Sequence, residues 1–418
     1  MDKIRIRGGK TLNGTVQAGG AKNAALPILF ASLLTEGECR FSRVPKLQDI
    51  RTTLKLLSQM GVETPKTLTG SEVSLRAKNI LSHEAPYDLV RTMRASVVVL
   101  GPLLARLGKA KVSLPGGCAI GARPINFHLT GLEKLGAKIE LEGGYVTATA
   151  KRLKGDRVRF EFPSVGATEN VMMAATLAQG ESVLENCAKE PEIVDLAEAL
   201  RGMGAQIEGD GTETIRIQGK DQLHGCDHAI MGDRIESGTF LAAAFATGGK
   251  VRVEGIAPET LEAVLVKFEE SGAIITRESN AITLASKGRP RGTDVTTLPF
   301  PGFPTDMQAQ FMAAMIVAEG TSILTETIFE NRFMHVPELA RLGADITIKG
   351  NTAVVRGTSG LKGAPLMATD LRASASLVIA GLCASGETEV NRIYHLDRGY
   401  EDMEKKLRSL GADIERIS

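Results

Sequence analysis

The chain has 418 residues, of which 43% are hydrophobic and 24% charged, and its formal net charge is +1. This composition is typical of a soluble globular protein, and the length favours two large domains over one core. A net charge near zero and an aromatic content of 4% without tryptophan argue against a nucleic-acid-binding surface, so no nucleic-acid partner is expected.

Targeting signals are missing from the places where they are usually found. The first ten residues, MDKIRIRGGK, lack the apolar core of a signal peptide. The most apolar run, ASVVVLGPLLARLG at 95–108, meets Arg106 long before it could span a bilayer, so no membrane insertion is expected. The five cysteines are odd in number and form no CxxC pair, which is typical of free thiols in a reducing compartment. We therefore expect a cytoplasmic protein.

The predicted elements begin with a strand at 3–8 and continue as a pattern that occurs six times. The first half of each copy is an alanine-rich helix end, a glycine and a short β run, at 30–41, 103–114, 175–185, 243–254, 315–326 and 381–392. The second half is a helix, a glycine and an alternating segment, at 58–64, 133–140, 201–208, 269–276, 340–347 and 408–415. The second glycine is typical of a helix C-cap that leads into a strand. Each copy therefore reads strand–helix–strand–helix–strand–strand.

Six copies suggest an α/β fold with three copies in each of two domains. Alanine-rich helices pack closely, so we expect them inside, surrounded by strands and outer helices. The strand at 3–8 precedes the first copy and the last copy ends at residue 418, so the first strand is expected to complete the last copy. This predicts one domain at 22–229 and a discontinuous second domain at 1–21 and 230–418, with the crossing near 225–231. A simple tandem split of the chain is the alternative.

Polar residues recur fourteen positions before the glycine that ends each alanine-rich helix. These positions hold Asn23, Arg94, Gly166, Arg234, Asp306 and Arg372. A helix start attracts anions, because its N–H groups are unpaired and carry a partial positive charge. If the three copies in each domain are related by threefold symmetry, the starts converge on one face. Two such faces, opposed across a hinge, would form an anion-binding cleft lined by Lys22, Asn23, Arg94, Asp306 and Arg372.

A structural role is the alternative for each of these residues. Asn23 and Asp306 could simply cap their helices. Arg94 and Arg372 have no capping role, and a cation at a helix N-terminus is unfavourable unless a negative group neutralises it. We therefore expect a negative partner for both arginines.

Three further positions carry candidate chemistry. Cys118 lies in SLPGGCAIGARP, where flanking glycines expose the thiol and Arg123 could lower its pKa; a small buried hydrophobe is the alternative. Asp306 lies in FPFPGFPTDMQAQF, at a helix start that favours an ionised carboxylate suited to act as a base or hydroxyl acceptor. Arg398 lies in IYHLDRGYED, a polar cluster just before the last helix.

Cofactor and metal motifs have little support. The segment HGCDH at 224–228 resembles a metal motif, but its loop setting and the lack of a carboxylate–histidine pattern argue against one. Neither GxGxxG at a helix start nor GxxxxGK[ST] occurs. We expect neither a metal nor a cofactor.

At these residues the sequence resembles the UDP-N-acetylglucosamine enolpyruvyl transferases. The matching stretches run from end to end and include GAKNAALPILFASLL, YDLVRTMRAS, SLPGGCAIGARP, PSVGAT, EPEIVDLA, FPTDMQAQF, FENRFMHVPELARLGA, ATDLRASASL and IYHLDRGYE. The resemblance implies a two-domain inside-out α/β barrel with three similar units per domain. It also implies transfer of the enolpyruvyl group of phosphoenolpyruvate to the 3-hydroxyl of UDP-N-acetylglucosamine with release of phosphate. This is an addition–elimination and the first committed step of peptidoglycan synthesis.

The resemblance also implies roles for individual residues. Cys118 would donate a proton to C3 of phosphoenolpyruvate, from a glycine-hinged lid that excludes water, and would form a covalent adduct with fosfomycin. Asp306 would accept the proton of the sugar hydroxyl, and Lys22 and Arg398 complete the implied catalytic set. The implied phosphoenolpyruvate contacts are Lys22, Asn23, Arg123 and Arg398. The implied UDP-N-acetylglucosamine contacts are Asn23, Arg94, Arg123, Pro124, Ile125, Asn126, Phe127, Ser164, Val165, Gly166, Asp306 and Ile328. Supporting candidates are Glu190, Asp233, Arg332 and Arg372.

Two positions depart from the family pattern, and two other functions stay open. Asn126 stands where many relatives carry an aspartate near the uracil, and Phe162 where some carry a lysine near the nucleotide. Uridine binding would then depend more on backbone groups. Enolpyruvyl transfer to shikimate 3-phosphate would need neither the cysteine loop nor PSVGAT. A non-catalytic repeat scaffold would be expected to have lost Lys22, Cys118, Asp306 and Arg398, which are all present.

Overall fold

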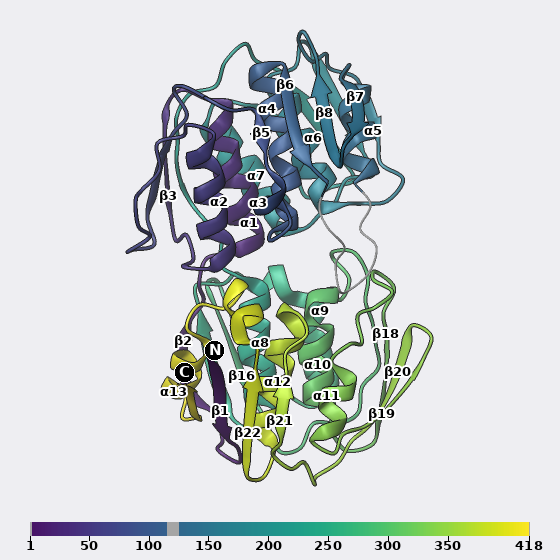
Figure 1. The fold of residues 1–418 in the computed structure, drawn as a ribbon. Coiled ribbons are helices and arrows are strands. Elements are labelled where there is room, and N and C mark those ends of the chain that lie inside the picture. The colour runs from purple at the N-terminus through teal and green to yellow at the C-terminus, as the bar shows by residue number, and fades with distance from the viewer. Residues whose placement is uncertain (1, 115–124, 418) are drawn as a thin grey trace. The chain divides into compact units, whose positions relative to one another are not determined.

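The computed structural model describes residues 2–114 and 125–417 (Figure 1). Cys118, Arg123 and Pro124 lie outside the described residues. The described chain divides into two compact units. The first unit contains residues 2–19 and 232–417, and the second contains 20–114 and 125–231. The domain boundaries expected after residues 21 and 229 remain a prediction about folding units.

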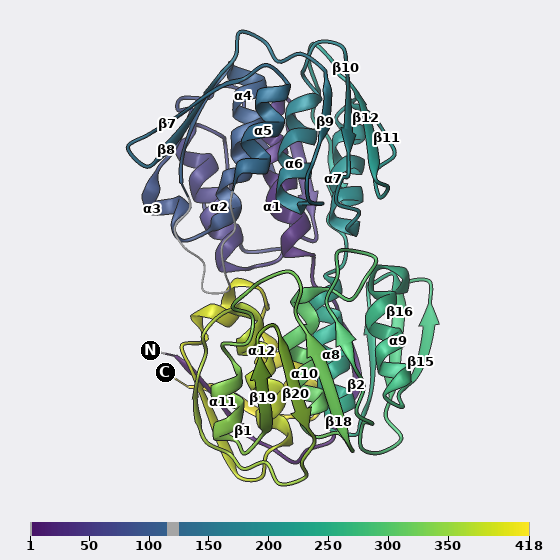
Figure 2. The same ribbon diagram turned by 90° about the vertical axis from the view of Figure 1, so that its right-hand side faces the viewer.

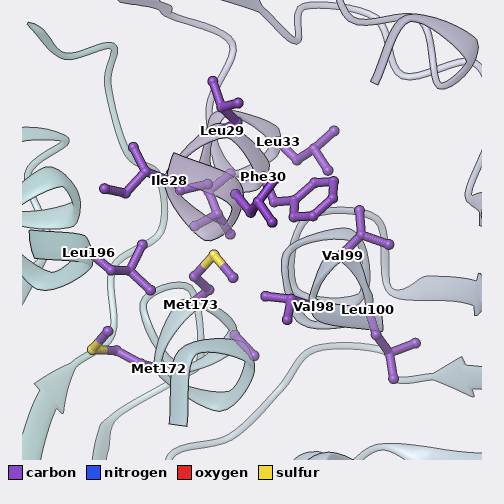
Figure 3. Close-up of a cluster of buried hydrophobic side chains, with 14 of the residues drawn as sticks. Ile28, Leu29, Phe30, Leu33, Val98, Val99, Leu100, Met172, Met173 and Leu196 are labelled. Carbon is purple, nitrogen blue, oxygen red and sulfur yellow. The ribbon is translucent and has the colours of Figure 1, made fainter. Parts of the chain in front are cut away.

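Three inner helices form the centre of the second unit. They are α1 (Lys22–Ala31), α4 (Leu100–Leu107), which follows the 3-10 turn η2 (Arg94–Val99), and α6 (Val165–Ala175). Figure 3 shows side chains from α1, from η2 at the start of α4 and from α6 pointing toward one another, among them Phe30, Val98 and Met173. These side chains are at most 4% exposed. Helices that are apolar on nearly all sides are stable only when surrounded, which explains their central place.

Outer helices and three sheets surround this centre. The outer helices are α2 (Gln48–Gln59), α5 (Asn126–Lys134) and α7 (Pro191–Gly202), with shorter turns at η1 (Ser32–Leu34) and α3 (Tyr87–Val90). The first sheet is β13 (Asp227–Ala229), β3 (Glu38–Ser42) and β4 (Val73–Arg76). The second is β5 (Glu84–Ala85), β6 (Lys109–Ser113), β8 (Tyr145–Thr149) and β7 (Lys138–Glu142). The third is β11 (Gln206–Glu208), β12 (Thr214–Gln218), β10 (Glu181–Glu185) and β9 (Arg157–Arg159).

The first unit repeats this plan around α8 (Arg234–Ala246), α10 (Gln308–Met315) and α12 (Leu371–Cys383), which contact one another (Figure 2). A 3-10 turn, η4 (Thr305–Met307), precedes α10. The outer elements are η3 (Pro258–Leu261), α9 (Glu262–Glu270), α11 (Val336–Arg341), η5 (Ile393–Arg398) and α13 (Met403–Ser409). Nowhere in 2–114 or 125–417 is a helix both long enough and apolar enough to span a bilayer.

The sheets of the first unit include the first two strands of the chain. The first sheet is β21 (Pro365–Met367), β22 (Glu387–Asn391), β1 (Lys3–Arg7) and β23 (Asp413–Ile417). The second is β15 (Ile274–Glu278), β16 (Ala281–Ala285), β14 (Lys250–Glu254) and β2 (Asn13–Gln17). The third is β17 (Val295–Thr296), β18 (Thr321–Thr325), β20 (Thr352–Arg356) and β19 (Asp345–Lys349). β1 pairs antiparallel with both β22 and β23, and β2 pairs in parallel with β14. None of the sheets formed by the described residues closes on itself.

The six outer helices end as the repeated glycines predict. Each repeated glycine directly follows the C-cap residue of its helix and has a φ between 91° and 103°. These glycines are Gly61, Gly136, Gly204, Gly272, Gly343 and Gly411. This left-handed conformation ends a helix and costs glycine little, because glycine has no Cβ. The predicted C-caps are therefore confirmed.

One predicted strand is reduced to a single bridge. The alternating segment after Gly61 was expected to form a strand, but only Glu63 pairs there, with Arg76. Pro65 follows two residues later and has no N–H to donate, and it also restricts the backbone of Thr64. The first sheet of the second unit therefore has three strands instead of four.

Candidate active site

The polar positions found by counting along the repeat all lie at the start of an inner helix or of the 3-10 turn before it. Each is the first or second residue of its element: Asn23 in α1, Arg94 in η2, Gly166 in α6, Arg234 in α8, Asp306 in η4 and Arg372 in α12. The prediction that these residues are equivalent is confirmed. The alternative that Asn23 and Asp306 are caps is wrong, because the residues at the N-cap positions are Ala21 and Pro304.

In the first unit, Asp306 is held by two buried arginines. Arg332 donates from Nη2 to Oδ1 of Asp306 at 2.9 Å, and Arg372 donates to Oδ2 from Nε at 3.1 Å and from Nη2 at 2.9 Å. The side chains of Arg332 and Arg372 are 4% and 3% exposed, whereas that of Asp306 is 27% exposed. The expectation that Arg372 needs a negative partner is confirmed. The carboxylate is fixed in orientation and still reaches solvent.

The two arginines also retain unused donors. Burial alone would lower the pKa of Arg372, but the Asp306 carboxylate together with Tyr400 and Asp233 outweighs it and the pKa is raised, so this guanidinium stays charged. Nη1 of Arg332 and Nη1 of Arg372 are buried and have no hydrogen-bond partner among the described residues. A buried guanidinium N–H without a partner is costly. The cluster therefore suits an additional anionic group at these two nitrogens.

Asp233 and Asp370 cap the neighbouring inner helices. The carboxylate of Asp233 accepts from the backbone N–H groups of Ile235 and Glu236 at 2.8 and 2.9 Å, at the start of α8. Asp370 accepts in the same way from Arg372 and Ala373 at the start of α12. Asp233 also acts on Arg372 electrostatically. Asp233, which was predicted as a supporting residue, therefore caps α8.

A glutamate that the sequence reasoning missed organises the chain around Asp306. Glu326 is 2% exposed and its carboxylate accepts from the hydroxyls of Thr297 and Thr305 at 2.8 and 2.9 Å. It also accepts from the backbone N–H of Ile328 at 2.8 Å, which fixes this predicted contact residue in the loop after β18. Because Thr305 precedes Asp306, Glu326 anchors the turn that carries the carboxylate.

Arg398 ends the 3-10 turn η5 and is half-buried. Its neighbour Asp397 accepts from Arg416 on β23, from Nη1 at 3.1 Å and from Nη2 at 2.5 Å. Arg416 also donates from Nε to Glu404 at 3.2 Å. Burial lowers the pKa of His395 in the same turn, and the positive charge of Arg398 lowers it further. The end of the chain thus holds the turn that carries Arg398.

In the second unit, Lys22 is the first residue of α1 and is 8% exposed. Its Nζ lies 3.3 Å from Oδ2 of Asp49, which is itself 3% exposed and lies in the first turn of α2. A buried ammonium is strongly disfavoured without such a partner. Asn23, the next residue, is half-buried. The ion pair therefore keeps a charged lysine at the start of an inner helix.

A second group of residues in this unit centres on His128. Its Nδ1 lies 3.0 Å from Nδ2 of Asn170 on α6, which also donates to the carbonyl of Val97 at 3.3 Å. Burial lowers the pKa of His128 to about 3, and the charge of Arg94 lowers it further, so the imidazole is neutral at pH 7. A Cβ on Gly166 would lie 3.2 Å from Cε1 of His128. The predicted residues Arg94 and Gly166 therefore meet at a histidine that the sequence reasoning did not single out.

The remaining predicted contacts occupy the starts of α5, α6 and α7. Ser164 caps α6, where its Oγ accepts from the N–H of Ala167 at 3.4 Å, and Val165 follows it. Ile125 is 9% exposed and precedes Asn126 and Phe127, the first two residues of α5. Glu190 occupies the N-cap position of α7 without a side-chain cap bond. Phe162 is 41% exposed.

The HGCDH segment makes ordinary contacts. His228 Nε2 lies 2.9 Å from Oδ1 of Asp195, and His224 Nδ1 lies 2.8 Å from the carbonyl of Gly225. In the part of the chain that the structure describes, no group of three or more His, Cys, Asp and Glu residues could hold a metal ion.

The arrangement of three inner helices within three sheets has close counterparts among solved structures. The enolpyruvyl transferase NikO from Streptomyces tendae superposes with a TM-score of 0.88 at 25% identity, covering 99% of this chain and 98% of that one. The EPSP synthase of Acinetobacter baumannii superposes with a TM-score of 0.75 at 20% identity over the whole of both chains, which is a likeness of fold alone. The fold is that of the enolpyruvyl transferases.

Sequence comparison defines the family within this fold. The model of the family described as EPSP synthase (3-phosphoshikimate 1-carboxyvinyltransferase) matches residues 6–407. Relatives named UDP-N-acetylglucosamine 1-carboxyvinyltransferase are 60% identical in Nitratidesulfovibrio vulgaris strain DP4 and 59% identical in Pseudoalteromonas atlantica, with alignments that cover all of this chain and 99–100% of the relatives. The chain belongs to this family of carboxyvinyltransferases, which confirms the resemblance inferred from its motifs.

Proposed function

We propose that the protein transfers the enolpyruvyl group of phosphoenolpyruvate to the 3-hydroxyl of UDP-N-acetylglucosamine and releases phosphate. The observation that carries the proposal is the Asp306 carboxylate, held between two buried arginines that each keep an unused N–H. Relatives that share 56–60% of the sequence over its full length are named for this activity. The step is the first committed reaction of peptidoglycan synthesis.

Asp306 is the group we assign to the acceptor. As the sugar hydroxyl attacks C2 of phosphoenolpyruvate, its proton passes to a carboxylate oxygen of Asp306. The two arginines fix the direction of this carboxylate and favour its ionised form, which a proton acceptor requires. Glu326 supports the same turn through Thr305. A carboxylate that is already held in one orientation loses less entropy on reaching the geometry for reaction.

Charged residues at the starts of helices and turns are assigned to phosphoenolpyruvate. We assign Lys22, Asn23, Arg123 and Arg398 to its phosphate and carboxylate, because planar guanidinium groups match both anions. The Lys22–Asp49 pair keeps the lysine charged until an anion arrives. The addition forms a tetrahedral intermediate, which loses phosphate and the proton gained at C3, so that the enol double bond is restored in the product.

The nucleotide sugar is assigned to residues of the second unit and the loop near Asp306. These are Asn23, Arg94, Arg123, Pro124, Ile125, Asn126, Phe127, Ser164, Val165, Gly166 and Ile328, with Glu190, Asp233, Arg332 and Arg372 in support. The starts of α5 and α6 offer backbone N–H groups, which are natural partners for a diphosphate. With Asn126 and Phe162 at positions often occupied by charged residues, backbone groups carry more of the uridine recognition.

Cys118 is assigned as the proton donor to C3 and as the site of covalent attack by fosfomycin. If the thiol acts as an acid, Cys118→Asp retains turnover and resists fosfomycin, whereas Cys118→Ala loses most turnover. Retention of full activity in Cys118→Ala would remove the cysteine from the mechanism. If a lid closes over it, saturating UDP-N-acetylglucosamine changes the alkylation rate of Cys118; an unchanged rate would exclude the lid.

A phosphate-release assay with alternative acceptors tests the proposed function. Phosphoenolpyruvate with UDP-N-acetylglucosamine is expected to yield phosphate, and phosphoenolpyruvate with shikimate 3-phosphate is not. Phosphate release only with shikimate 3-phosphate would reverse the assignment. Release with neither acceptor, from a protein with a normal unfolding transition, would favour a non-catalytic scaffold. We further propose that residues 22–229 fold as one domain, that residues 1–21 and 230–418 fold as the other, and that the enzyme works in the cytoplasm.

A further inference from the structure

Two cysteines outside the site described above lie opposite each other on neighbouring strands. β13 and β3 are parallel, with Asp227 opposite Arg40 and His228 opposite Phe41. One residue earlier, the same register places Cys226 opposite Cys39, and the N–H of Arg40 donates to the carbonyl of Cys226 at 2.7 Å. We propose that Cys39 and Cys226 form a redox-active dithiol that closes reversibly to a disulfide.

The local backbone brings the two segments that carry these residues close together. A Cβ on Gly225 would lie 2.0 Å from the carbonyl oxygen of Glu38, and a Cβ on Gly37 would lie 2.3 Å from the nitrogen of Gly225. Neither position tolerates a side chain, so glycine just before each cysteine region permits the approach. Neighbouring strands are about 4.8 Å apart. Opposed residues at about that spacing fall within the Cα separation that a disulfide requires, about 4.4–6.8 Å.

Both thiols also face the same side of the sheet. Cys39 is 0% exposed and Cys226 is 7% exposed, and both belong to the hydrophobic core of the second unit. Both are free thiols in the structure. Because side chains alternate between the faces of a strand, two core-facing residues in register point the same way. The sulfurs are therefore presented to each other and not to opposite faces.

The repeat shows that the fold does not require cysteine at these two positions. The equivalent pairs in the other five sheets are Ala110 and His83, Ser182 and Asp156, Val251 and Gly14, Ser322 and Thr293, and Thr388 and Ala364. In one of these pairs the N–H of Thr293 donates to Oγ of Ser322 at 2.9 Å. Side chains other than cysteine thus occupy the same positions in the other sheets. The paired thiols are specific to the first copy.

The chemistry of the pair is that of adjacent thiols. A hydrogen bond from the Cys226 thiol lowers the pKa of Cys39, whereas burial raises the pKa of Cys187 and of Cys383 to about 12. With hydrogen peroxide as the oxidant, the Cys39 thiolate becomes a sulfenic acid and hydroxide is released. The Cys226 thiol then displaces water and forms the S–S bond. Overall, two thiols and one peroxide give one disulfide and two waters.

The disulfide would tie the segment 226–231 to β3. This segment leads to the boundary at residues 231 and 232 between the two units. It is also held by the three paired residues of β13, by the N–H of Ile230, which donates to the carbonyl of Ser42 at 3.0 Å, and by Asp195, which contacts His228 and accepts from the N–H of Met231 at 3.1 Å. A covalent link closes a long loop and so reduces the freedom of the unfolded chain. Oxidation is therefore expected to stabilise the second unit.

Mass mapping of the full chain after oxidation tests the proposal. The protein is treated with hydrogen peroxide, the remaining thiols are alkylated, and peptides are separated without reductant. A linked pair of peptides containing Cys39 and Cys226, two mass units lighter than their sum and split by dithiothreitol, is expected. Cys187 and Cys383 are expected to remain alkylated. Linkage of either cysteine mainly to another partner, or conversion of both to sulfinic acids without a link, would overturn the proposal.

A stability measurement with a matched variant gives a second, independent test. Cys39→Ser copies the residue found at the equivalent positions 182 and 322, so the fold should accept it. Oxidation is expected to raise the Tm of the unmodified chain by several degrees, and dithiothreitol should reverse the shift. Cys39→Ser is expected to show no such shift. Equal shifts in both proteins, or none in either, would contradict the dithiol.

Discussion

Asp306 shows how one residue gains a function from its position. In sequence it is an acidic residue near a helix start, where a carboxylate usually caps the helix. In the structure the capping position belongs to Pro304, and the carboxylate instead meets Arg332 and Arg372, which come from 26 and 66 positions later in the chain. Two buried cations face one partly exposed anion. The carboxylate therefore stabilises the buried charges of the arginines, and the arginines in turn fix the orientation of the carboxylate.

The first residue-scale prediction concerns this cluster. Asp306→Asn keeps the shape but removes the charge, so kcat should fall by about 10²–10⁴, the range for loss of a general base. The unfolding free energy should also fall, by about 3–5 kcal/mol, because two buried guanidinium groups lose their anion. Steady-state phosphate release and urea unfolding measure the two effects.

A matched variant separates charge from geometry in the same cluster. Arg372→Lys keeps the positive charge but cannot donate two hydrogen bonds to Oδ2 of Asp306. Its unfolding free energy should fall less than that of Asp306→Asn. Asp306→Asn with unchanged turnover would exclude the carboxylate from the reaction.

The second residue-scale prediction concerns two buried histidines. Burial is the main cause that lowers the pKa of His128 to about 3 and that of His335 to about 4. Below pH 6.5 the unfolded chain binds a proton at each histidine while the folded chain does not, so stability falls as pH falls. Between pH 8 and pH 5 each histidine should reduce the unfolding free energy by about 2 kcal/mol.

Urea unfolding of single variants over this pH range checks the prediction. His335→Gln removes one titrating group, and its unfolding free energy should depend less on pH than that of the unmodified chain. His224→Gln is the matched control, because this ring is not buried among core residues. A pH dependence in His335→Gln as steep as in the unmodified chain would show that His335 does not titrate as described.

At the scale of elements, the turn η5 illustrates support from a distant part of the sequence. Arg398 ends this turn. Arg416 of β23 donates hydrogen bonds to both carboxylate oxygens of the neighbouring residue, Asp397. Arg416 in turn is held by Glu404 at the start of α13. A short 3-10 turn has poor hydrogen bonds of its own. Its geometry therefore depends on this side-chain clamp.

Arg416→Gln is expected to weaken substrate binding as well as stability. The turn that carries Arg398 loses its clamp, so the KM for phosphoenolpyruvate should rise several-fold with a smaller change in kcat. The partly exposed pair with Asp397 should contribute about 1 kcal/mol or less to the unfolding free energy, but the loss should be larger overall, because the buried Glu404 also loses its arginine partner. Arg7→Gln, on β1 of the same sheet, removes an arginine that pairs with Glu387 on β22 and Asp413 on β23, and it serves as the control. Equal changes in KM for both variants would contradict the clamp.

The sequence predicted elements better than it predicted contacts. The repeat placed the six inner helix starts and the six glycine caps, because both depend on residues within one turn of the helix end. It overestimated one strand, where Pro65 interrupts pairing. Glu326, His128 and Arg416 were not found, because their partners lie far away in sequence and no local pattern marks a buried carboxylate or imidazole. Cys118, Arg123 and Pro124 lie outside the described residues.

At the scale of the whole molecule, the first strands belong with the last copies of the repeat. β1 lies between β22 and β23, and β2 takes the parallel edge beside β14, the place that β13 takes beside β3. Lys3 lies opposite Ile417. Only residues 418, 1 and 2 would separate these two if the ends of the chain were joined, and a three-residue connection suits an antiparallel hairpin.

A circular permutant is therefore expected to fold. It begins at residue 20, runs to 418, continues directly into residue 1 and ends at residue 19. Its Tm should lie within a few degrees of that of the unmodified chain, because every strand keeps its partners. Deletion of residues 2–19 is the control and should abolish the cooperative transition of the first unit, which loses two strands. A permutant that unfolds like the deletion would show that the original order of the strands is required.

The position of β1 also sets the order in which a growing polypeptide can complete its sheets. Residues 3–7 leave the ribosome long before their partners at 387–391 and 413–417. At about 5–20 residues per second this strand waits tens of seconds for its neighbours, while the intervening 20–231 can already collapse around α1, α4 and α6. Lys3, Arg5 and Arg7 alternate with Ile4 and Ile6 along it. Positive charge on every second residue disfavours pairing with other strands, so it reduces aggregation of this segment before its partners are synthesised.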